Sequence, residues 1–454
     1  MLRRYNGNKG NNSGGDINDE SAPVLPDPGN STPLLSSPLI HYGQLHRRRL
    51  MMIFFFFFVL LTVSSSYLGR FLFENTMSLI LYQRQYKQHY WNDAFEISST
   101  GHNQAKGYGY CTLETCLDSN KCHDNKARNI YIYPPDASHV ESFFRWAGGS
   151  YYRQSQQMFE DQVVAYLQKQ QQSQKMNIVT NPDDACLFLP RMYVHTRNDV
   201  WEGFALFRLR SLPHWDIDGR NHIIVDPGDD MYRSIPQADK AIFLRAAFHQ
   251  SLLRGGYDVQ TLYSPFKNLS HRVERNSTAF LQRPILASFK GKQKVRLRAN
   301  LANMLGEEKD VIVLVEGTTS PSDYNAWDYD DLLLRSRFCI APRGLGLHSY
   351  RMAECMSAGC IPVIISDGYA WPDSDMLGVG MEEPRLQWDE LAIRIEESSL
   401  DGLVQRLRSI SDAELKQMHQ NVLLAYSRLK TAGALHPIGG ILVVLQRIEK
   451  ILVT

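Results

Sequence analysis

Short apolar runs alternate with segments of helical spacing through the last third of the chain. Phe338 to Ala341 and Ile361 to Ile365 have the length and composition of buried strands. Between them, the amphipathic segment from His348 to Ser357 predicts a helix that ends at Gly359. A strand, a glycine turn, a helix and a second strand make a βαβ unit, so this stretch predicts an α/β fold.

The same alternation continues on both sides of that unit and predicts a second α/β domain over residues 283–454. The expected strands are Ile285 to Phe289, Val311 to Val315 and Leu391 to Ile395; the expected helices are Val295 to Leu305, a short one beginning at Leu332, and segments near 399–408, 412–429 and 438–451; Lys290 to Lys292 is expected to be a turn.

Upstream, strands and helices also alternate and predict a first α/β domain over residues 126–282. The expected strands are Asn129 to Tyr133, Ala185 to Pro190 and His222 to Val225, with helices over Tyr151 to Gln172 and Val200 to Leu212. A chain of 454 residues is long enough for two such domains.

A different pattern, an unbroken apolar run, covers residues 50–68 and approaches the ~20 residues that span a bilayer. Three arginines precede the run, which places the polar tail, residues 1–46, in the cytosol. The long polar leader disfavours a cleaved signal peptide. Five phenylalanines, Phe54 to Phe58, leave no polar face for a core helix. We therefore expect a single-pass signal anchor with the rest of the chain in the lumen, beginning with a stem over residues 71–125.

Sequons and cysteines agree with a lumenal position. Asn268 and Asn276 head N-x-Ser/Thr acceptors. Cys111, Cys116 and Cys122 form a cluster that predicts a disulfide-stapled collar, because their spacing lacks the paired CxxC of a zinc site.

Seven cysteines is an odd count, so at least one is free or paired outside the chain. Cys339, Cys355 and Cys360 lie in or beside apolar runs. They are interpreted as buried packing residues or one disulfide, since no basic partner is placed to activate a thiol.

A formal net charge of +1 gives no large basic field, so the composition argues against a nucleic-acid partner. Positive charge is instead local. Arg343, Gly344, His348, Ser349 and Arg351 gather where the glycine turn meets the predicted helix. Guanidinium groups and bare backbone donors at such a place are typical of a diphosphate site.

This stretch also resembles a known family. Ser336 to Asp375 follow the signature S-[RK]-F-C-x-x-P-R-G…S-[YF]-R-x-x-E-[AC]…A-[GA]-C-I-P-V-[IL]-[IL]-S-[DN]-G…P-x-S-[DE] of exostosin-type glycosyltransferases, glycosyltransferase family 47. Asp373 departs from it, since the family usually has Phe there. Phe289, Lys290, Gly291 and Arg296 match a second pattern, F-[KA]-G…R.

Weaker matches precede these in the right order: NIYIYPP, NPDDACLFLPRMY and LRSLPHWDIDGRNHIIVD. Asn181 stands in the second where relatives usually have Asp. After GRNHIIV many relatives carry a His-Asp pair or a glycine loop, whereas this chain has Asp226-Pro-Gly-Asp229-Asp230.

The resemblance implies a GT-B architecture, in which two Rossmann-like domains face a cleft. It implies a nucleotide-sugar donor, UDP-linked by expectation, and inversion at the anomeric carbon. The expected diphosphate ligands are Arg343, Arg296 and Arg351, helped by the Lys290–Gly291 segment. Glu354 is expected to bind the ribose hydroxyls. Fixed arginines would make a metal or other cofactor unnecessary.

Each assignment has a plainer alternative. Arg351 and Glu354 at i,i+3 could simply pair on a helix surface, and Ser349 could serve as a cap. Asp229 and Asp230 are the best-placed candidates for the base that takes the acceptor proton, but Asp-Pro-Gly-Asp is also ordinary turn sequence. Three D-x-D triplets, at residues 216, 328 and 373, are not assigned a metal; the one at 328 is expected to cap a helix.

These expectations describe a Golgi type II glycosyltransferase that extends a glycan or glycoprotein, held in the membrane by one helix and able to dimerise with a like or unlike chain. Two other classes fit less well: an inactive transferase-like partner subunit and a membrane-tethered glycan-binding protein. The pattern leaves the sugar, the acceptor and the linkage open.

Overall fold

The computed structural model describes residues 111–135, 137, 159–191, 207–216, 218–226, 238–262, 265–273, 277–378, 386–436 and 438–453. All of them belong to one compact unit that extends from Ala94 to Thr454. The expected tail (1–46), signal anchor (50–68) and most of the stem lie outside the described residues. Within the described ranges no helix is long and apolar enough to cross a membrane.

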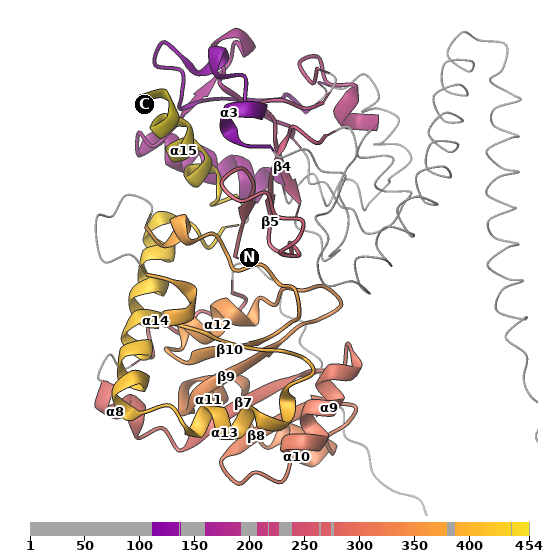
Figure 1. The fold of residues 1–454 in the computed structure, drawn as a ribbon, viewed down its shortest axis with the longest axis vertical. Helices are drawn as coiled ribbons and strands as arrows, with labels where there is room; N and C mark the ends of the chain where they lie inside the picture. Colours follow the sequence, from indigo (N-terminus) through magenta and orange to yellow (C-terminus); the bar gives the residue numbers. More distant parts are fainter. Residues whose placement is uncertain are drawn as a thin grey trace, which may run out of the picture. The chain divides into compact units, whose positions relative to one another are not determined.

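The second half of the chain builds a five-stranded, all-parallel sheet (Figure 1). Its strands are β7 (Ile285–Lys292), β8 (Val311–Glu316), β9 (Ser336–Pro342), β10 (Ile361–Ile365) and β11 (Ile393–Ile395). The order across the sheet is β11-β10-β9-β7-β8. All five strands were predicted. The prediction of a turn over Lys290–Lys292 was wrong, because Gly291 and Lys292 continue β7 and pair with Val315 and Glu316 of β8.

Helices lie between and after these strands, and all but the two short ones at residues 277–281 and 321–325 were predicted. They are α8 (Ser277–Leu281), α9 (Arg296–Leu305), α10 (Pro321–Asn325), α11 (Tyr329–Arg335), α12 (Arg351–Ser357), α13 (Leu403–Arg408) and α14 (Asp412–Ala432), with short turns η4 (Ser374–Leu377), η5 (Trp388–Glu390) and η6 (Leu400–Gly402). Asp328 caps α11 through the N–H groups of Asp330 and Asp331, as expected of that D-x-D triplet. Helix α12 begins three residues later than predicted.

The first half carries short parallel strands in two three-stranded sheets, β2-β1-β3 and β4-β5-β6, linked by an isolated bridge between Phe188 and His222. The strands are β1 (Asn129–Ile132), β2 (Asn177–Val179), β3 (Leu187–Leu189), β4 (Ile223–Asp226), β5 (Ile242–Arg245) and β6 (Val259–Gln260); the helical elements are α3 (Leu113–Cys116), η1 (Ser119–Cys122), η2 (Glu160–Val164), α6 (Ala165–Gln172) and η3 (Pro182–Asp184). The α/β class is therefore confirmed, with parallel sheets consistent with a GT-B-like fold.

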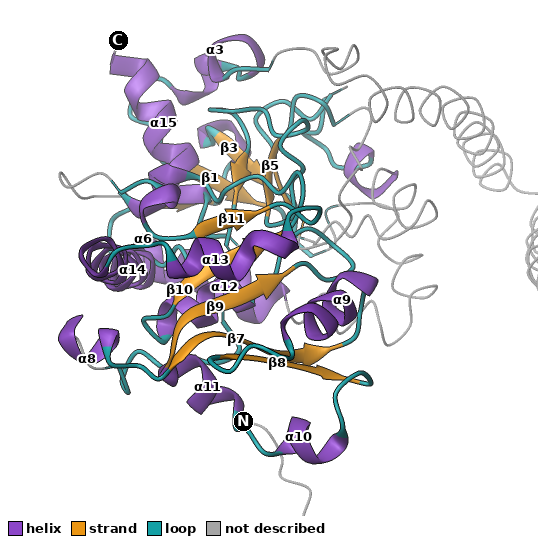
Figure 2. Cartoon of the chain, turned by 60° about the horizontal axis from the view of Figure 1, so that its bottom comes forward, coloured by secondary structure: helices purple, strands orange, loops and turns teal. Residues whose placement is uncertain are grey.

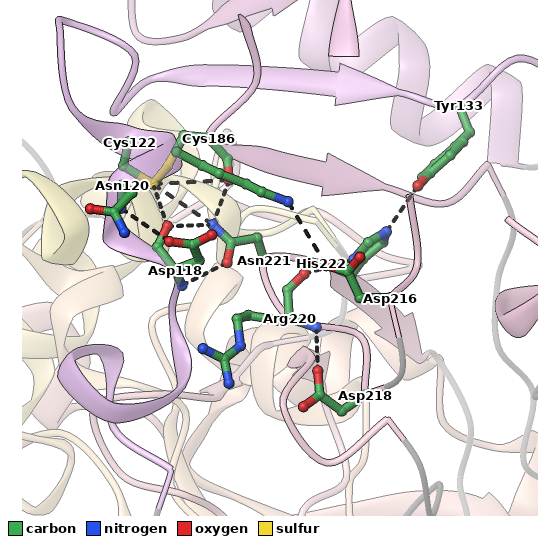
Figure 3. A network of polar contacts seen from close by, with 11 residues as sticks. Asp118, Asn120, Cys122, Tyr133, Cys186, Asp216, Asp218, Arg220, Asn221 and His222 are labelled. Carbon is green, nitrogen blue, oxygen red and sulfur yellow. Dashed lines mark hydrogen bonds and ion pairs between the residues drawn. A yellow bond between two sulfur atoms is a disulfide. The ribbon is translucent and has the colours of Figure 1, made fainter. Parts of the chain in front are cut away.

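A buried polar network fastens the start of the described chain to the first half (Figure 3). Asn221 is fully buried. It accepts the Asp118 backbone N–H at 2.8 Å and donates to the Asp118 and Cys186 carbonyl oxygens at 3.1 and 2.9 Å. His222 lies within 3.0 Å of the Tyr133 hydroxyl, and burial lowers the pKa of His222 to about 3. The G-R-N-H motif thus has a structural role.

Six of the seven cysteines pair as Cys111–Cys116, Cys122–Cys186 and Cys339–Cys360, and Cys355 is free. A disulfide within the predicted collar and the odd, free cysteine are confirmed, but the third collar cysteine, Cys122, pairs with Cys186 beside β3. Burial raises the pKa of the Cys355 thiol, which makes it a packing residue rather than a nucleophile.

The last helix returns to the first half of the chain. Helix α15 (Ile441–Val453) contacts α3 and η1 (Figure 1). Arg128 beside β1 pairs with Glu449, and Arg447 links Asp373 and the Asp258 carbonyl oxygen. The final residues therefore complete the first half of the chain, although they follow the second in sequence.

Candidate active site

The five-stranded sheet has a switch point between β7 and β9, which lie side by side in Figure 2. From β7 the chain moves to β8 on one side, and from β9 it moves to β10 and β11 on the other. At such a point the connections leave in opposite directions, so a crevice opens outside the carboxyl ends of the two strands. The residues at this edge are therefore the first place to look for a ligand site.

Arg298 of α9 lies beneath this edge and is 7% exposed. Its three nitrogens donate to backbone carbonyl oxygens at the ends of β7 and β9, at 3.0–3.1 Å, namely those of Lys292, Pro342 and Arg343. Desolvation, with a smaller contribution from Arg351, lowers the pKa of Arg298 to about 10. The side chain forms no ion pair with any described residue.

Arg351 of α12 lies at the same edge and is 5% exposed. Its Nη2 donates to the Lys290 carbonyl oxygen at 2.5 Å, and its guanidinium lies 4.6 Å from the centroid of the Phe289 ring. Its Nε has no hydrogen-bond partner among the described residues. A Cβ on Gly291 would come within 2.8 Å of Nη2, so glycine is what lets this guanidinium approach β7.

Two buried guanidinium groups without a carboxylate are unusual. Removing an ion from water costs several kcal/mol, and proteins offset that cost with an opposite charge. Within the described ranges, Arg298 and Arg351 form no ion pair. Their hydrogen-bond acceptors are carbonyl oxygens, and Glu354, one turn along α12, interacts with Arg351 through its charge alone. The edge of β7 and β9 is therefore suited to an anion.

The turn between β9 and α12 offers further donors. The Arg343 N–H bonds to the Ile365 carbonyl oxygen at 2.9 Å, but the N–H groups of Gly344 to Leu347 donate to no acceptor in the described part of the chain. Successive free N–H groups in a turn make an anion-binding concavity. The turn and the two buried arginines therefore point to the same kind of ligand.

The sequence of the chain matches the Exostosin GT47 domain over residues 124–410, more than half of the chain. The chain belongs to the exostosin family of glycosyltransferases.

Its relatives include the Exostosin-1 homolog of Caenorhabditis elegans, 27% identical over 362 residues, which cover 70% of this chain and 85% of the worm protein. Exostosin-1 of Drosophila melanogaster is 25% identical over 352 residues, and Exostosin-2 of Bos taurus is 23% identical over 330. The alignments cover only 42% and 43% of those two proteins.

In this exostosin-family chain, Arg343 is already paired. Its Nε and Nη2 donate to the two carboxylate oxygens of Glu397 at 2.5 and 3.0 Å. Glu397 also accepts the Asp367 N–H at 3.2 Å. Both side chains of the pair keep partial exposure, 25% and 20%. Sequence reasoning missed Glu397, which lies 54 residues downstream of its partner.

Arg298, and not the predicted Arg296, lies buried at the switch point. Arg296 opens α9 and is exposed, while the buried face of that helix holds Leu297, Arg298, Leu301 and Leu305. Arg298 stands three residues before Leu301 and seven before Leu305, and this helical spacing is the signal that identifies it. The R-L-R sequence matches the family pattern at its first arginine, but the structure places the second at the switch point.

Glu354 lies on α12 and is 1% exposed. One carboxylate oxygen accepts the Tyr329 hydroxyl, and the other accepts the Lys267 backbone N–H at 3.1 Å. Burial raises the pKa of Glu354 above its ordinary value. No ion pair joins Glu354 to Arg351 within the described chain, so the surface-pair alternative is not what the structure shows.

The remaining predicted ligands surround this edge. Lys290 turns toward the loop before α11, where Nζ donates to the Trp327 carbonyl oxygen at 2.6 Å. The Ser349 hydroxyl accepts the Arg351 N–H at 3.4 Å.

Two further predicted ligands lie in or next to the turn before α12. Desolvation lowers the pKa of His348 to about 3, so this imidazole is neutral near pH 7. Gly344 has its N–H in the open turn described above.

Asp229 and Asp230, the predicted bases, lie outside the described residues. Asp226 just before them is buried and pairs with Arg245 at 2.6 Å, so that carboxylate is committed. The D-x-D triplet at 373 is likewise held by Arg447. In the ranges that the structure covers, no three His, Cys, Asp or Glu side chains gather to hold a metal ion.

The first half of the chain also contributes a side chain that sequence reasoning did not single out. The Gln250 N–H bonds to the Gly368 carbonyl oxygen at 2.7 Å. The His249 ring packs on Gly368, where a Cβ would meet Nε2 at 2.1 Å. His249 therefore lies next to the loop after β10, which holds Asp367, the hydrogen-bond partner of Glu397.

Proposed function

We propose that this chain transfers a sugar from a UDP-linked donor to a glycan acceptor, and that Arg298 and Arg351 stabilise the leaving diphosphate. The observation that carries the proposal is the pair of buried guanidinium groups, neither of them in an ion pair with a described residue, at the switch point of the five-stranded sheet. Membership of the exostosin family supports glycosyl transfer as the reaction.

The chemistry follows from charge. Breaking the bond from the sugar to the nucleotide leaves a diphosphate with one more negative charge, and fixed cations and N–H dipoles stabilise that charge as it develops. In the proposed complex, the diphosphate contacts the N–H groups of the Gly344–Leu347 turn above the two buried guanidinium groups. No metal ion is needed in this scheme.

Arg343 joins the site by exchanging partners. Partly exposed ion pairs contribute about 0–1 kcal/mol, so the Arg343–Glu397 pair can open when a phosphate competes for the guanidinium. Its planar fork fits phosphate as well as carboxylate. Glu354 would bind a ribose hydroxyl in place of the Tyr329 hydroxyl. Inversion requires a base on the acceptor side, and Asp229 or Asp230 is proposed for that role.

The decisive experiment compares arginine variants of the full-length protein. Arg351→Met and Arg298→Met should each weaken UDP binding about 10- to 100-fold, because a charge-assisted hydrogen bond contributes about 1.5–3 kcal/mol. Arg296→Met is the matched control, since it removes an exposed arginine from the same helix. Calorimetry gives the affinities, and release of UDP from a panel of UDP-sugars gives the activity.

Two outcomes would contradict the proposal. In one, Arg296→Met weakens UDP binding as much as the buried-site variants do. In the other, the wild-type protein neither binds UDP nor releases it from any donor. The second result would instead favour an inactive partner subunit or a glycan-binding protein.

We further propose that the chain is a Golgi type II membrane protein with residues 50–68 as its anchor and its globular part in the lumen. The Asn268 acceptor is exposed, with its side-chain oxygen accepting the Ser270 hydroxyl at 2.8 Å. Lumenal residence should attach a glycan there, so removal by glycosidase should shift the gel mobility of the wild type. The Asn268→Gln variant should show a smaller shift after the same treatment, because one glycan acceptor is missing. A chain whose mobility the glycosidase leaves unchanged would contradict lumenal placement.

A further inference from the structure

Two aromatic side chains near the switch point are exposed and in contact. Phe266 is 79% exposed and Tyr350 is 38% exposed. Their ring centroids are 4.5 Å apart, and the planes cross at 73°. Single exposed apolar side chains are normal on protein surfaces, but paired aromatic rings at the border of a ligand site need an explanation.

The chain positions of the two rings tie them to the predicted ligands. Tyr350 directly precedes Arg351 and accepts the Glu354 N–H at its carbonyl oxygen, at 3.3 Å. Phe266 directly precedes Lys267, whose N–H bonds to the Glu354 carboxylate at 3.1 Å. The aromatic pair therefore stands beside the buried carboxylate, on segments separated by more than 80 residues in the sequence.

The environment of Tyr350 extends to the anion site. Tyr350 is the N-cap residue of α12, the helix that begins at Arg351. Leu345, in the turn with open N–H groups, is 62% exposed. Apolar surface and anion-binding donors thus border one another here, which suits a ligand with a flat ring at one end and phosphates at the other.

We propose that Phe266 and Tyr350 form the stacking platform for the nucleobase of the donor. This inference rests on the proposed function, because it assigns a position to one part of the same nucleotide. A base stacked on the platform would place its ribose next to Glu354 and its diphosphate toward the Gly344–Leu347 turn and Arg351. Every base has a π face, so the platform adds affinity without selecting uracil over other bases.

The test compares UDP with inorganic pyrophosphate on the full-length protein. Phe266→Ala should weaken UDP binding about 5- to 100-fold, the range that corresponds to loss of one base–aromatic stack. Pyrophosphate has no base, so its affinity should stay unchanged. Phe266→Trp should restore UDP binding. Leu424→Ala is the matched control, because Leu424 is 38% exposed on α14 and lies away from these residues in the sequence.

Three results would overturn the platform. The first is an unaltered UDP affinity in Phe266→Ala. The second is an equal loss of UDP and pyrophosphate affinity, which would mean that the anion site is disturbed. The third is a rise in the KM for the acceptor glycan alone, which would make the rings an acceptor surface. Failure of the proposed function looks different, since the wild type would then bind neither UDP nor pyrophosphate. Melting temperatures of all variants show that the fold is intact.

Discussion

Buried arginines in the two halves of the chain have different kinds of partner. In the first half, Arg245 is 2% exposed, and its Nη2 pairs with Asp226 at 2.6 Å, where β4 and β5 end side by side. In the second half, Arg298 and Arg351 are as well buried at the ends of β7 and β9, but they contact carbonyl oxygens and rings rather than carboxylates. The first arrangement is complete without a ligand, and the second is not.

Two sets of polar groups illustrate the same difference. Asn221 in the first half uses both its side-chain oxygen and its amide group in hydrogen bonds. In the second half, the Nε of Arg351 and the N–H groups from Gly344 to Leu347 have no acceptor among the described residues. Buried polar atoms without a partner also occur in the first half, such as Trp215 Nε1, so the argument for the candidate site depends on several such groups lying at one sheet edge.

The largest expected effect tests the paired side of this contrast. Arg245→Met leaves Asp226 buried without its cation and should lower the free energy of unfolding by about 3–5 kcal/mol. Arg351→Met removes a cation that forms no ion pair and should lower that free energy by less, about 1–3 kcal/mol, because it leaves the Lys290 carbonyl oxygen without its donor. Denaturant unfolding monitored by circular dichroism measures both. Equal losses of stability would mean that Arg351 is structural, and the contrast would fail.

A smaller effect is expected at the polar network of the first half. Asn221→Ala strands the Asp118 N–H and the Cys186 carbonyl oxygen, and leaving a buried group unsatisfied costs about 1–3 kcal/mol. Asn120→Ala, an exposed change in the same segment, should alter stability by less than about 0.5 kcal/mol. The same unfolding curves report both. If Asn221→Ala matched its control, the network would contribute little to stability.

The smallest effect is a dependence on pH. The pKa of His222 falls from an ordinary 6.5 to about 3 on folding. Its contribution to stability is therefore complete above pH 6.5 and is lost as the pH falls toward 3, at a slope that approaches about 1.4 kcal/mol per pH unit. His222→Gln should lose less stability than wild type between pH 6.5 and 5. Parallel pH profiles for the two proteins would show that His222 does not titrate as described.

Much of the fold follows from local patterns. The strands of the second sheet are apolar runs bounded by glycine, proline or charge, and the helices between them have a clear apolar face. Lys290 to Lys292 misled because glycine and lysine are typical of turns, yet their backbone groups pair with β8. Strands β2, β5 and β6 were not predicted; β2 has three residues and β6 only two, too few for a period to be seen.

The sequence pattern brought some residues of the candidate site together but missed most of their contacts. The turn and Arg351 are where the pattern placed them. Arg296 was preferred over Arg298 because a family motif fixes residue types without fixing helical phase. The Arg343–Glu397 pair joins residues 54 positions apart, and the Lys267–Glu354 bond joins residues 87 apart. Neither contact follows from local spacing, because each depends on how distant segments meet in the folded chain.

The return of α15 to the first half of the chain constrains how the protein can fold during synthesis. Glu449, which pairs with Arg128, lies 321 positions further along the chain. The earlier-made half therefore stays incomplete until α15 has been made, while the sheet made before α15 can form first. Nascent chains stalled before α15 has left the ribosome should be more sensitive to protease around β1 than around β9.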